Sequence, residues 1–219
     1  MKLSEKYLEC GIKGVNEQEL LEVLLYCSGY NMCLKSKAKN LINKYGNLKT
    51  ILSQDDKVLL KNGEINTKFL IIKKLINEFF YEDYLKRLRK FGPILSNSSL
   101  VIEFLKQQFA YELKEKFGVL FLNTNYEFIK YESFSFGTID KTIIFIREVT
   151  EKVLLCNAKN IIIVHNHPSG VMIPSDDDIR ITRKLKEGLL LLEINLVDHI
   201  LITHMGYFSF MEKGVLWKY

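Results

Sequence analysis

The chain of 219 residues has little of several features that would place it in a special class of protein. It holds only three prolines, and no apolar run approaches the roughly 20 residues that a membrane-spanning helix needs. Its four cysteines do not follow the paired spacing of a zinc ribbon. We therefore expect no membrane partner, and we expect reduced thiols at Cys10, Cys27, Cys33 and Cys156.

The first residues, Met1–Lys6, lead into a charged segment and lack the apolar stretch of a signal peptide. A cytoplasmic location is the resulting expectation. The composition, 47% hydrophobic and 26% charged, is typical of a globular protein. The length is enough for one large domain or two small ones.

Charge is distributed unevenly along the chain. Residues 1–97 hold 17 Lys and Arg against 11 Asp and Glu, whereas residues 98–219 hold 14 against 15. The basic first half suits either an anionic partner or a lysine-rich solvated surface. A Gly-Pro step and a Ser/Asn cluster follow Phe91. We therefore predict a first domain over residues 1–92, a linker over 93–98 and a second domain over 99–219.

The first domain carries apolar residues at helical spacing. Asn16 and Asn47 are candidate N-caps, and Gly46 is a candidate helix stop. In the last helix we expect the apolar residues between Phe69 and Phe80 to form one packed side. The predicted helices cover residues 17–26, 36–45, 47–52, 55–60 and 67–89.

The second domain alternates between strand and helix patterns. A turn signal at Asn123-Thr124-Asn125 predicts a hairpin, and strands then alternate with helices. The order predicts an α/β fold with a mixed β-sheet and flanking helices, preceded by a small all-α domain. The predicted strands are 116–122, 126–132, 161–164 and 196–203, and the predicted helices are 100–109, 147–157 and 175–192.

The stretch His165–Asp178 carries the clearest chemical signal. Two of the four histidines, His165 and His167, stand one residue apart just after the apolar run Asn160–Val164. With Asp178 they would form a three-ligand metal set with a fourth position open. Asp178 is also the fourth residue of the helix-start pattern Ser175-x-x-Asp178, in which it would cap the helix. The spacing alone leaves both interpretations open.

This stretch also resembles a known family. His165-x-His167-Pro168 followed by Pro174-Ser175-x-x-Asp178 is similar to the JAMM metal motif of the MPN/JAB1 zinc-hydrolase superfamily. The sequence His-Asn-His-Pro-Ser-Gly resembles that of the bacterial RadC branch of this superfamily. The resemblance covers roughly residues 98–219 and implies a JAB1/MPN or cytidine-deaminase-like fold. Further residues that resemble the family sequence lie at Phe136–Ile139, Arg147–Val149 and Val197–Ile200.

The resemblance implies that His165, His167 and Asp178 bind one Zn²⁺ per chain. It also implies that Ser175 stabilises the oxyanion of a tetrahedral intermediate. The implied activity is that of a metallopeptidase, which hydrolyses peptide or isopeptide bonds of a protein substrate with a zinc-activated water.

A glutamate upstream of the motif is expected to act as general base. By the resemblance this residue is Glu115, which precedes the first strand of the second domain. Glu112 and Glu132 are the alternatives. Asp198 and His199 could orient a ligand, or could form a buried hydrogen-bonded pair on a strand.

The first domain resembles a degenerate helix-hairpin-helix module. In the turn Leu60–Lys68 only Gly63 remains of the Gly-hydrophobic-Gly pattern, and Glu64 adds a negative charge where a phosphate would lie. The alternative function is a DNA-associated non-catalytic module with a role in DNA repair or recombination, with DNA bound through residues 1–92. A third possibility is a zinc-holding interaction scaffold.

Overall fold

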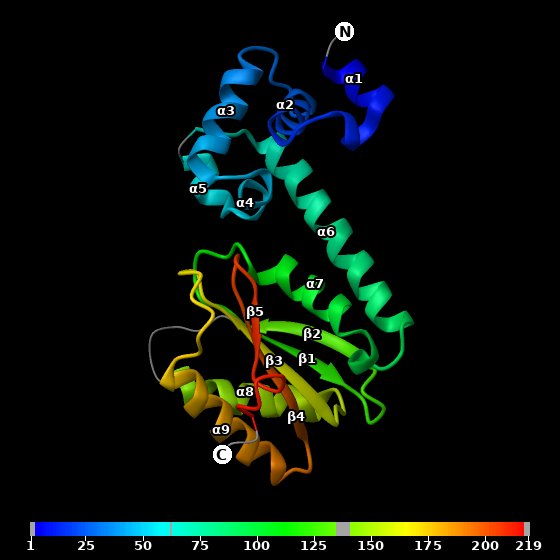
Figure 1. The fold of residues 1–219 in the computed structure, drawn as a ribbon, viewed down its shortest axis with the longest axis vertical. Coiled ribbons are helices and arrows are strands. Elements are labelled where there is room, and N and C mark those ends of the chain that lie inside the picture. Colours follow the sequence, from blue (N-terminus) through cyan, green and yellow to red (C-terminus); the bar gives the residue numbers. More distant parts are fainter. Residues whose placement is uncertain (1–2, 62, 135–140, 217–219) are drawn as a thin grey trace. The chain divides into compact units, whose positions relative to one another are not determined.

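The computed structural model of the chain describes residues 3–61, 63–134 and 141–216 (Figure 1). Two compact units are distinguished, Met1–Tyr81 and Glu82–Tyr219. The division lies inside the long helix α6 (Thr67–Lys90), upstream of the segment predicted as a linker. The domain limits 1–92 and 99–219 stay a prediction. No helix in the described ranges is both long and apolar enough to cross a bilayer.

The first unit is helical, as predicted. Asn16 forms a capping box with Glu19, the Asn47 side chain accepts from the Thr50 N–H, and Gly46 ends a helix with φ of 89°. These local signals explain why the helix limits follow the sequence pattern closely. The elements before α6 are α1 (Leu3–Cys10), the 3₁₀ helix η1 (Gly11–Gly14), α2 (Glu17–Cys27), α3 (Leu34–Tyr45), α4 (Leu48–Ser53) and α5 (Asp56–Lys61).

The expected packed side of α6 was wrong beyond its first turns. Phe69 is 1% exposed and belongs to the core that α2 to α5 form. Leu75, Phe79 and Phe80 are instead 60%, 71% and 49% exposed. The short helices of the first unit cover only the beginning of α6. Apolar periodicity therefore predicted the helix but not the length over which it is covered.

The turn that enters α6 is closed by the protein itself. Ile65 is buried, and the Asn66 carboxamide oxygen accepts from the Phe69 N–H at 2.8 Å, which caps α6. The Glu64 carboxylate accepts from Lys44 and from the Tyr45 hydroxyl, the latter at 2.6 Å. A carboxylate thus lies in the turn where the helix-hairpin-helix resemblance would place a phosphate.

The second unit is an α/β domain with a five-stranded sheet in the order β2-β1-β3-β4-β5. β3 and β4 are parallel and are joined through α9, and the other neighbours are antiparallel. The predicted α/β fold with a mixed sheet is confirmed. Its elements are η2 (Ile94–Asn97), α7 (Ser98–Phe109), β1 (Phe117–Leu122), β2 (Phe128–Phe134), α8 (Lys141–Leu155), β3 (Asn160–Asn166), α9 (Asp176–Leu190), β4 (Asn195–Ile202) and β5 (Tyr207–Ser209).

The segment predicted as a linker is packed on this domain. The Ile94 N–H donates to the Tyr126 carbonyl at 2.9 Å, and Pro93 forms an isolated β-bridge with Glu127. Ile94 itself is 4% exposed. The Gly-Pro step therefore marks a break between helices but not a free connection. The supporting residues Phe136–Ile139 lie outside the described residues.

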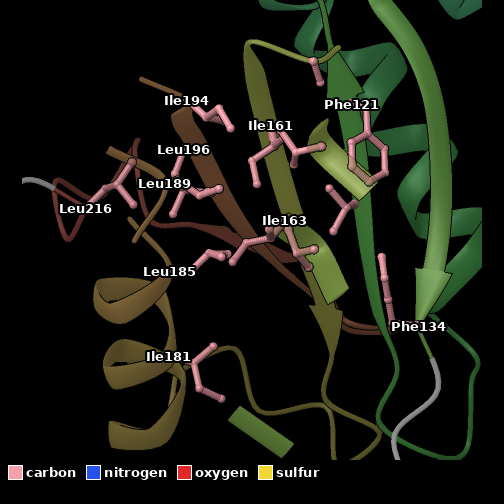
Figure 2. Packing of buried hydrophobic residues seen from close by; sticks show 14 of the residues in the cluster. Phe121, Phe134, Ile161, Ile163, Ile181, Leu185, Leu189, Ile194, Leu196 and Leu216 are labelled. Carbon is pink, nitrogen blue, oxygen red and sulfur yellow. The ribbon is translucent and has the colours of Figure 1, made fainter. Parts of the chain in front are cut away.

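Helices cover both faces of the sheet. Side chains of α8 and α9 pack with Ile161, Ile163 and Phe121 on one face (Figure 2). α7 covers the other face, where Phe109 contacts Gly118 so closely that an added Cβ would lie 2.8 Å from its ring. Because side chains alternate along a strand, each residue of β3 faces either α7 or the α8/α9 layer. This alternation places the functional site.

Candidate metal centre

The end of β3 delivers two histidines toward α9. His165 shares the face of Ile161 and Ile163 and is 1% exposed. His167 follows the last strand residue, and a tight turn then reverses the chain through a bond from the Gly170 N–H to the His167 carbonyl. Gly170 has φ of 83°, and a Cβ there would lie 2.5 Å from His204. The turn therefore requires glycine at this position.

The start of α9 supplies the carboxylate. Ser175 is the N-cap, and its hydroxyl oxygen lies 3.2 Å from the Asp178 N–H that it accepts. In return, Asp178 Oδ2 accepts from the Ser175 N–H and hydroxyl, both at 2.7 Å. Asp178 is 7% exposed. The capping interpretation of this residue is therefore confirmed, and the metal-site interpretation stays a prediction.

The three side chains converge on one point. His165 Nε2 lies 3.2 Å from Asp178 Oδ1, and His167 Nε2 lies 3.4 Å from Asp178 Oδ2. The two Nε2 atoms are 3.2 Å apart. Two ligands bound to one tetrahedral zinc at about 2.0–2.1 Å are separated by about 3.3 Å. The spacing of the donors thus fits a single zinc ion.

Partners on the far side of each imidazole orient the rings. His167 Nδ1 lies 3.0 Å from the Val171 carbonyl. A carbonyl only accepts, so Nδ1 carries the proton and Nε2 presents a lone pair to the centre. His165 Nδ1 lies 2.7 Å from Nε2 of His199, whose Nδ1 lies 2.6 Å from the Thr182 hydroxyl. Each ring is therefore held by a contact outside the centre.

The electrostatics around the centre favour an anionic Asp178 and a neutral His199. Burial opposes the charge of Asp178, but hydrogen bonding and attraction from His165 and hydrogen bonds from Ser175 outweigh it and hold its pKa below the ordinary value. Burial lowers the pKa of His199 well below its ordinary value, and repulsion from His165 adds to this effect. An anionic carboxylate is the form in which Asp178 can act as a metal ligand.

Glu115 precedes β1. β1 and β3 pair with Phe117 opposite His165, and the two rings stack at 5.2 Å. The pairing ends there, so Glu115, two residues before Phe117, lies outside the ladder. The Glu115 side chain is exposed, and within the described parts of the chain no hydrogen bond or ion pair joins it to the three converging side chains.

The alternative glutamates are engaged elsewhere. Glu112 forms an ion pair with Lys116 at 2.5 Å. Glu132 lies on β2, which β1 separates from β3, and its carboxylate binds Lys130 at 2.6 Å. The choice of Glu115 as general base stays a prediction.

Sequence reasoning missed two buried residues around the centre. The Asn166 side chain accepts from the Lys116 N–H at 2.8 Å and donates to the carbonyls of Lys114 and Glu112 at 3.1 and 3.3 Å. It therefore holds the segment on both sides of Glu115, and we call these three hydrogen bonds the clamp. Thr182 lies one helical turn after Asp178, and this spacing was the signal that could have identified it.

The interpretation of Asp198 and His199 as a buried hydrogen-bonded pair is confirmed, because Asp198 Oδ1 accepts from the His199 N–H at 2.7 Å. Both are buried, but their side chains point to different partners because neighbours on a strand face opposite sides. His199 contacts His165, as the orienting interpretation expected, whereas Asp198 accepts from the Ser209 hydroxyl at 2.6 Å. His204 is exposed.

Comparison with known proteins identifies the family of the chain. Residues 95–215 match the family model described as RadC-like JAB domain. The chain is 36% identical to a UPF0758 protein of Fusobacterium nucleatum, covering 98% of this chain and 95% of that protein. It is 33% identical to a UPF0758 protein of Haemophilus influenzae, covering 97% and 96%, and 32% identical to one of Cellvibrio japonicus, covering 97% and 94%.

The matched family model spans the whole sheet, both histidines and the aspartate of the centre. The full-length similarity to three separate relatives extends the match through the helical unit. On this evidence the chain belongs to the RadC-like JAB domain family.

Proposed function

We propose that the chain is a zinc-dependent hydrolase of peptide or isopeptide bonds. The observation that carries the proposal is the set of separations among the two Nε2 atoms and the two carboxylate oxygens of Asp178, 3.2, 3.2 and 3.4 Å, which are close to the spacing of ligands around one tetrahedral zinc. A set of two imidazoles and one carboxylate also leaves a fourth position open, as catalytic zinc sites do.

His165, His167 and Asp178 would hold the metal. Zinc bound there would act as a Lewis acid and lower the pKa of a coordinated water from 15.7 to about 7. The Val171 carbonyl keeps the proton of His167 on Nδ1, so that its Nε2 is free to donate a lone pair. Ser175 orients the Asp178 carboxylate through two hydrogen bonds. The protein side of the site is therefore preorganised for a cation.

Glu115 would accept the proton of the attacking water and return it to the leaving amine. Its support is its position two residues before Phe117, which pairs with His165, and the Asn166 side chain, which binds the backbone on both sides of Glu115. Ser175 lies at the helix N-terminus next to the carboxylate, and its single hydroxyl proton, which donates to Asp178 Oδ2, would turn to the developing oxyanion. One such donor contributes about 3 kcal/mol to lowering the barrier.

The first test is the metal content of the purified protein. We expect one zinc per chain in the wild type, none in a variant with His165→Ala and His167→Ala, and one in His204→Ala, which removes an exposed histidine. A peptidase screen of the zinc-loaded protein then compares wild type with Glu115→Gln, which we expect to bind zinc but lose turnover. Wild-type protein without bound zinc would refute the proposal, because the three donors would then share a proton.

A DNA-associated role is a second proposal. The excess of Lys and Arg in residues 1–97 favours it, and the Glu64 carboxylate in the turn before α6 weighs against it. Salt-dependent binding to DNA is the relevant measurement.

A further inference from the structure

A chain of buried hydrogen bonds runs from the backbone of α9 to the ring of His165. The Thr182 hydroxyl lies 2.5 Å from the Asp178 carbonyl and 2.6 Å from His199 Nδ1. His199 Nε2 lies 2.7 Å from His165 Nδ1. Thr182, His199 and His165 are 4%, 0% and 1% exposed. These hydrogen bonds thus have no access to solvent at any of the three residues.

The direction of every proton in this chain follows from its first member. A carbonyl oxygen cannot donate, so the single hydroxyl proton of Thr182 points to Asp178. The hydroxyl oxygen must then accept from His199 Nδ1–H. A neutral His199 carries only one ring proton, so its Nε2 accepts from His165 Nδ1–H. His165 therefore keeps its Nε2 lone pair, which is the atom that faces His167 and Asp178.

Aromatic rings close the chain on both sides. Phe210 stacks on His199 at 4.4 Å with an interplanar angle of 19°, and Phe117 stacks on His165 at 5.2 Å and 16°. His199 is 0% exposed, and both of its ring nitrogens already lie within hydrogen-bond distance of a partner. Neither ring can therefore turn to a water molecule for another partner.

We infer that Thr182 and His199 are positioning residues that fix the tautomer of His165 and so set the zinc affinity of the site. This hydrogen-bond relay, from Thr182 through His199 to His165, rests on the proposed zinc site. It adds two residues that act on the zinc affinity without touching the metal. Removing the Thr182 hydroxyl leaves His199 Nδ1–H without its acceptor. The other neutral tautomer, with the proton on Nε2, then donates to His165 Nδ1 and drives the His165 proton onto Nε2. That proton occupies the position of the metal bond.

The test compares Thr182→Val with Thr182→Ser, which restores the hydroxyl. Zinc affinity is measured by competition with a chromophoric chelator. We expect Thr182→Val to bind zinc about 10- to 100-fold more weakly, because this is the typical loss of affinity when a hydrogen-bond partner of a metal ligand is removed. Thr182→Ser should bind as the wild type does. Thr150→Val is the matched control, because Thr150 makes the same backbone contact within α8, away from the site.

A second readout does not involve metal. Nitrogen-15 NMR of chelator-treated protein reports which ring nitrogen of each histidine carries the proton. We expect Nδ1–H for both His165 and His199 in the wild type and in Thr182→Ser, and a shift toward Nε2–H in Thr182→Val.

The outcomes separate the two proposals. Wild-type protein that binds zinc while Thr182→Val matches its affinity and its tautomers refutes the relay and leaves the hydrolase intact. Wild-type protein that binds no zinc refutes the hydrolase. In that case, Nε2–H on His165 in the treated wild type refutes the relay as well, and Nδ1–H upholds the proton order. A Thr182→Val protein that does not fold is replaced by His199→Gln, for which the same loss of affinity is expected.

Discussion

Asp198 on β4 is a buried carboxylate whose ionisation should limit the stability of the protein at neutral pH. Its Oδ1 accepts from the N–H groups of His199 and Met211, and its Oδ2 accepts from the Ser209 hydroxyl. These bonds favour the charged form, but burial outweighs them and raises the pKa of Asp198 from 3.8 to about 6. Replacement by asparagine keeps the shape and removes the charge.

The sign and size of the effect follow from linkage. Between the unfolded pKa near 3.8 and the folded pKa near 6, the folded state holds a proton that the unfolded state has lost. Stability from this group is therefore fully present at low pH and is lost as the pH rises to about 6. A pKa difference of about two units between the folded and unfolded states corresponds to about 3 kcal/mol of unfolding free energy. Asp198→Asn should recover about that amount above pH 7, because its amide N–H can donate to the Ser209 oxygen in place of the bond that the Ser209 hydroxyl now donates to Oδ2.

The assay is urea unfolding of wild type and Asp198→Asn at several pH values from 4 to 8, with chelator present throughout. We expect the stability difference, variant minus wild type, to rise by about 2–3 kcal/mol across this range. Asp83→Asn, which removes an exposed carboxylate, should show no such rise. The titration of His199 affects both proteins and cancels in the difference. A flat difference would refute the reasoning, since burial would then not penalise the charge.

Further predictions concern the clamp, the packing and the basic half. Asn166→Ala should keep bound zinc but lower kcat in a peptidase assay, because the segment around Glu115 loses three hydrogen bonds; an unchanged kcat would contradict the clamp. Gly118→Ala should lower stability by about 1–3 kcal/mol, since its Cβ would lie 2.7 Å from a tyrosine ring, whereas Gly188→Ala in α9 should raise it by about 0.5–1 kcal/mol in thermal unfolding. Residues 1–92 should carry any DNA affinity, so the wild type should show salt-dependent retention that a Lys61→Glu, Lys68→Glu variant loses; no retention at low salt would argue against DNA.

Much of the fold could be predicted because its signals are local. Asn16, Asn47 and Gly46 act on helix ends within a few residues of themselves, and the structure has all three in those roles. The exposed apolar side of α6 could not be predicted in the same way. Which neighbours cover Leu75 or Phe79 depends on how far the short helices extend, and sequence spacing does not report that distance.

The candidate site divides along the same line. His165, His167 and Asp178 lie within fourteen residues of one another, and their spacing and resemblance were enough to bring them together. Thr182 and His199 meet only because α9 packs on the sheet beside β4. The contact of Asn166 with the segment before β1 joins residues about 50 positions apart. Such pairings depend on tertiary structure and leave no periodic trace in the chain.

The alternation at the end of β3 has a consequence for how this family can change its length. His165 faces α9, and Asn166 faces the opposite side, where it binds the segment before β1. Inserting or deleting one residue within β3 would exchange these two faces, so the metal donor and the clamp would be lost in a single event. Side chains in the loop between His167 and Ser175 do not alternate between two faces of a sheet. This loop can therefore lengthen as long as Ser175 still begins α9. Natural variation in length should therefore concentrate in that loop and spare the strand.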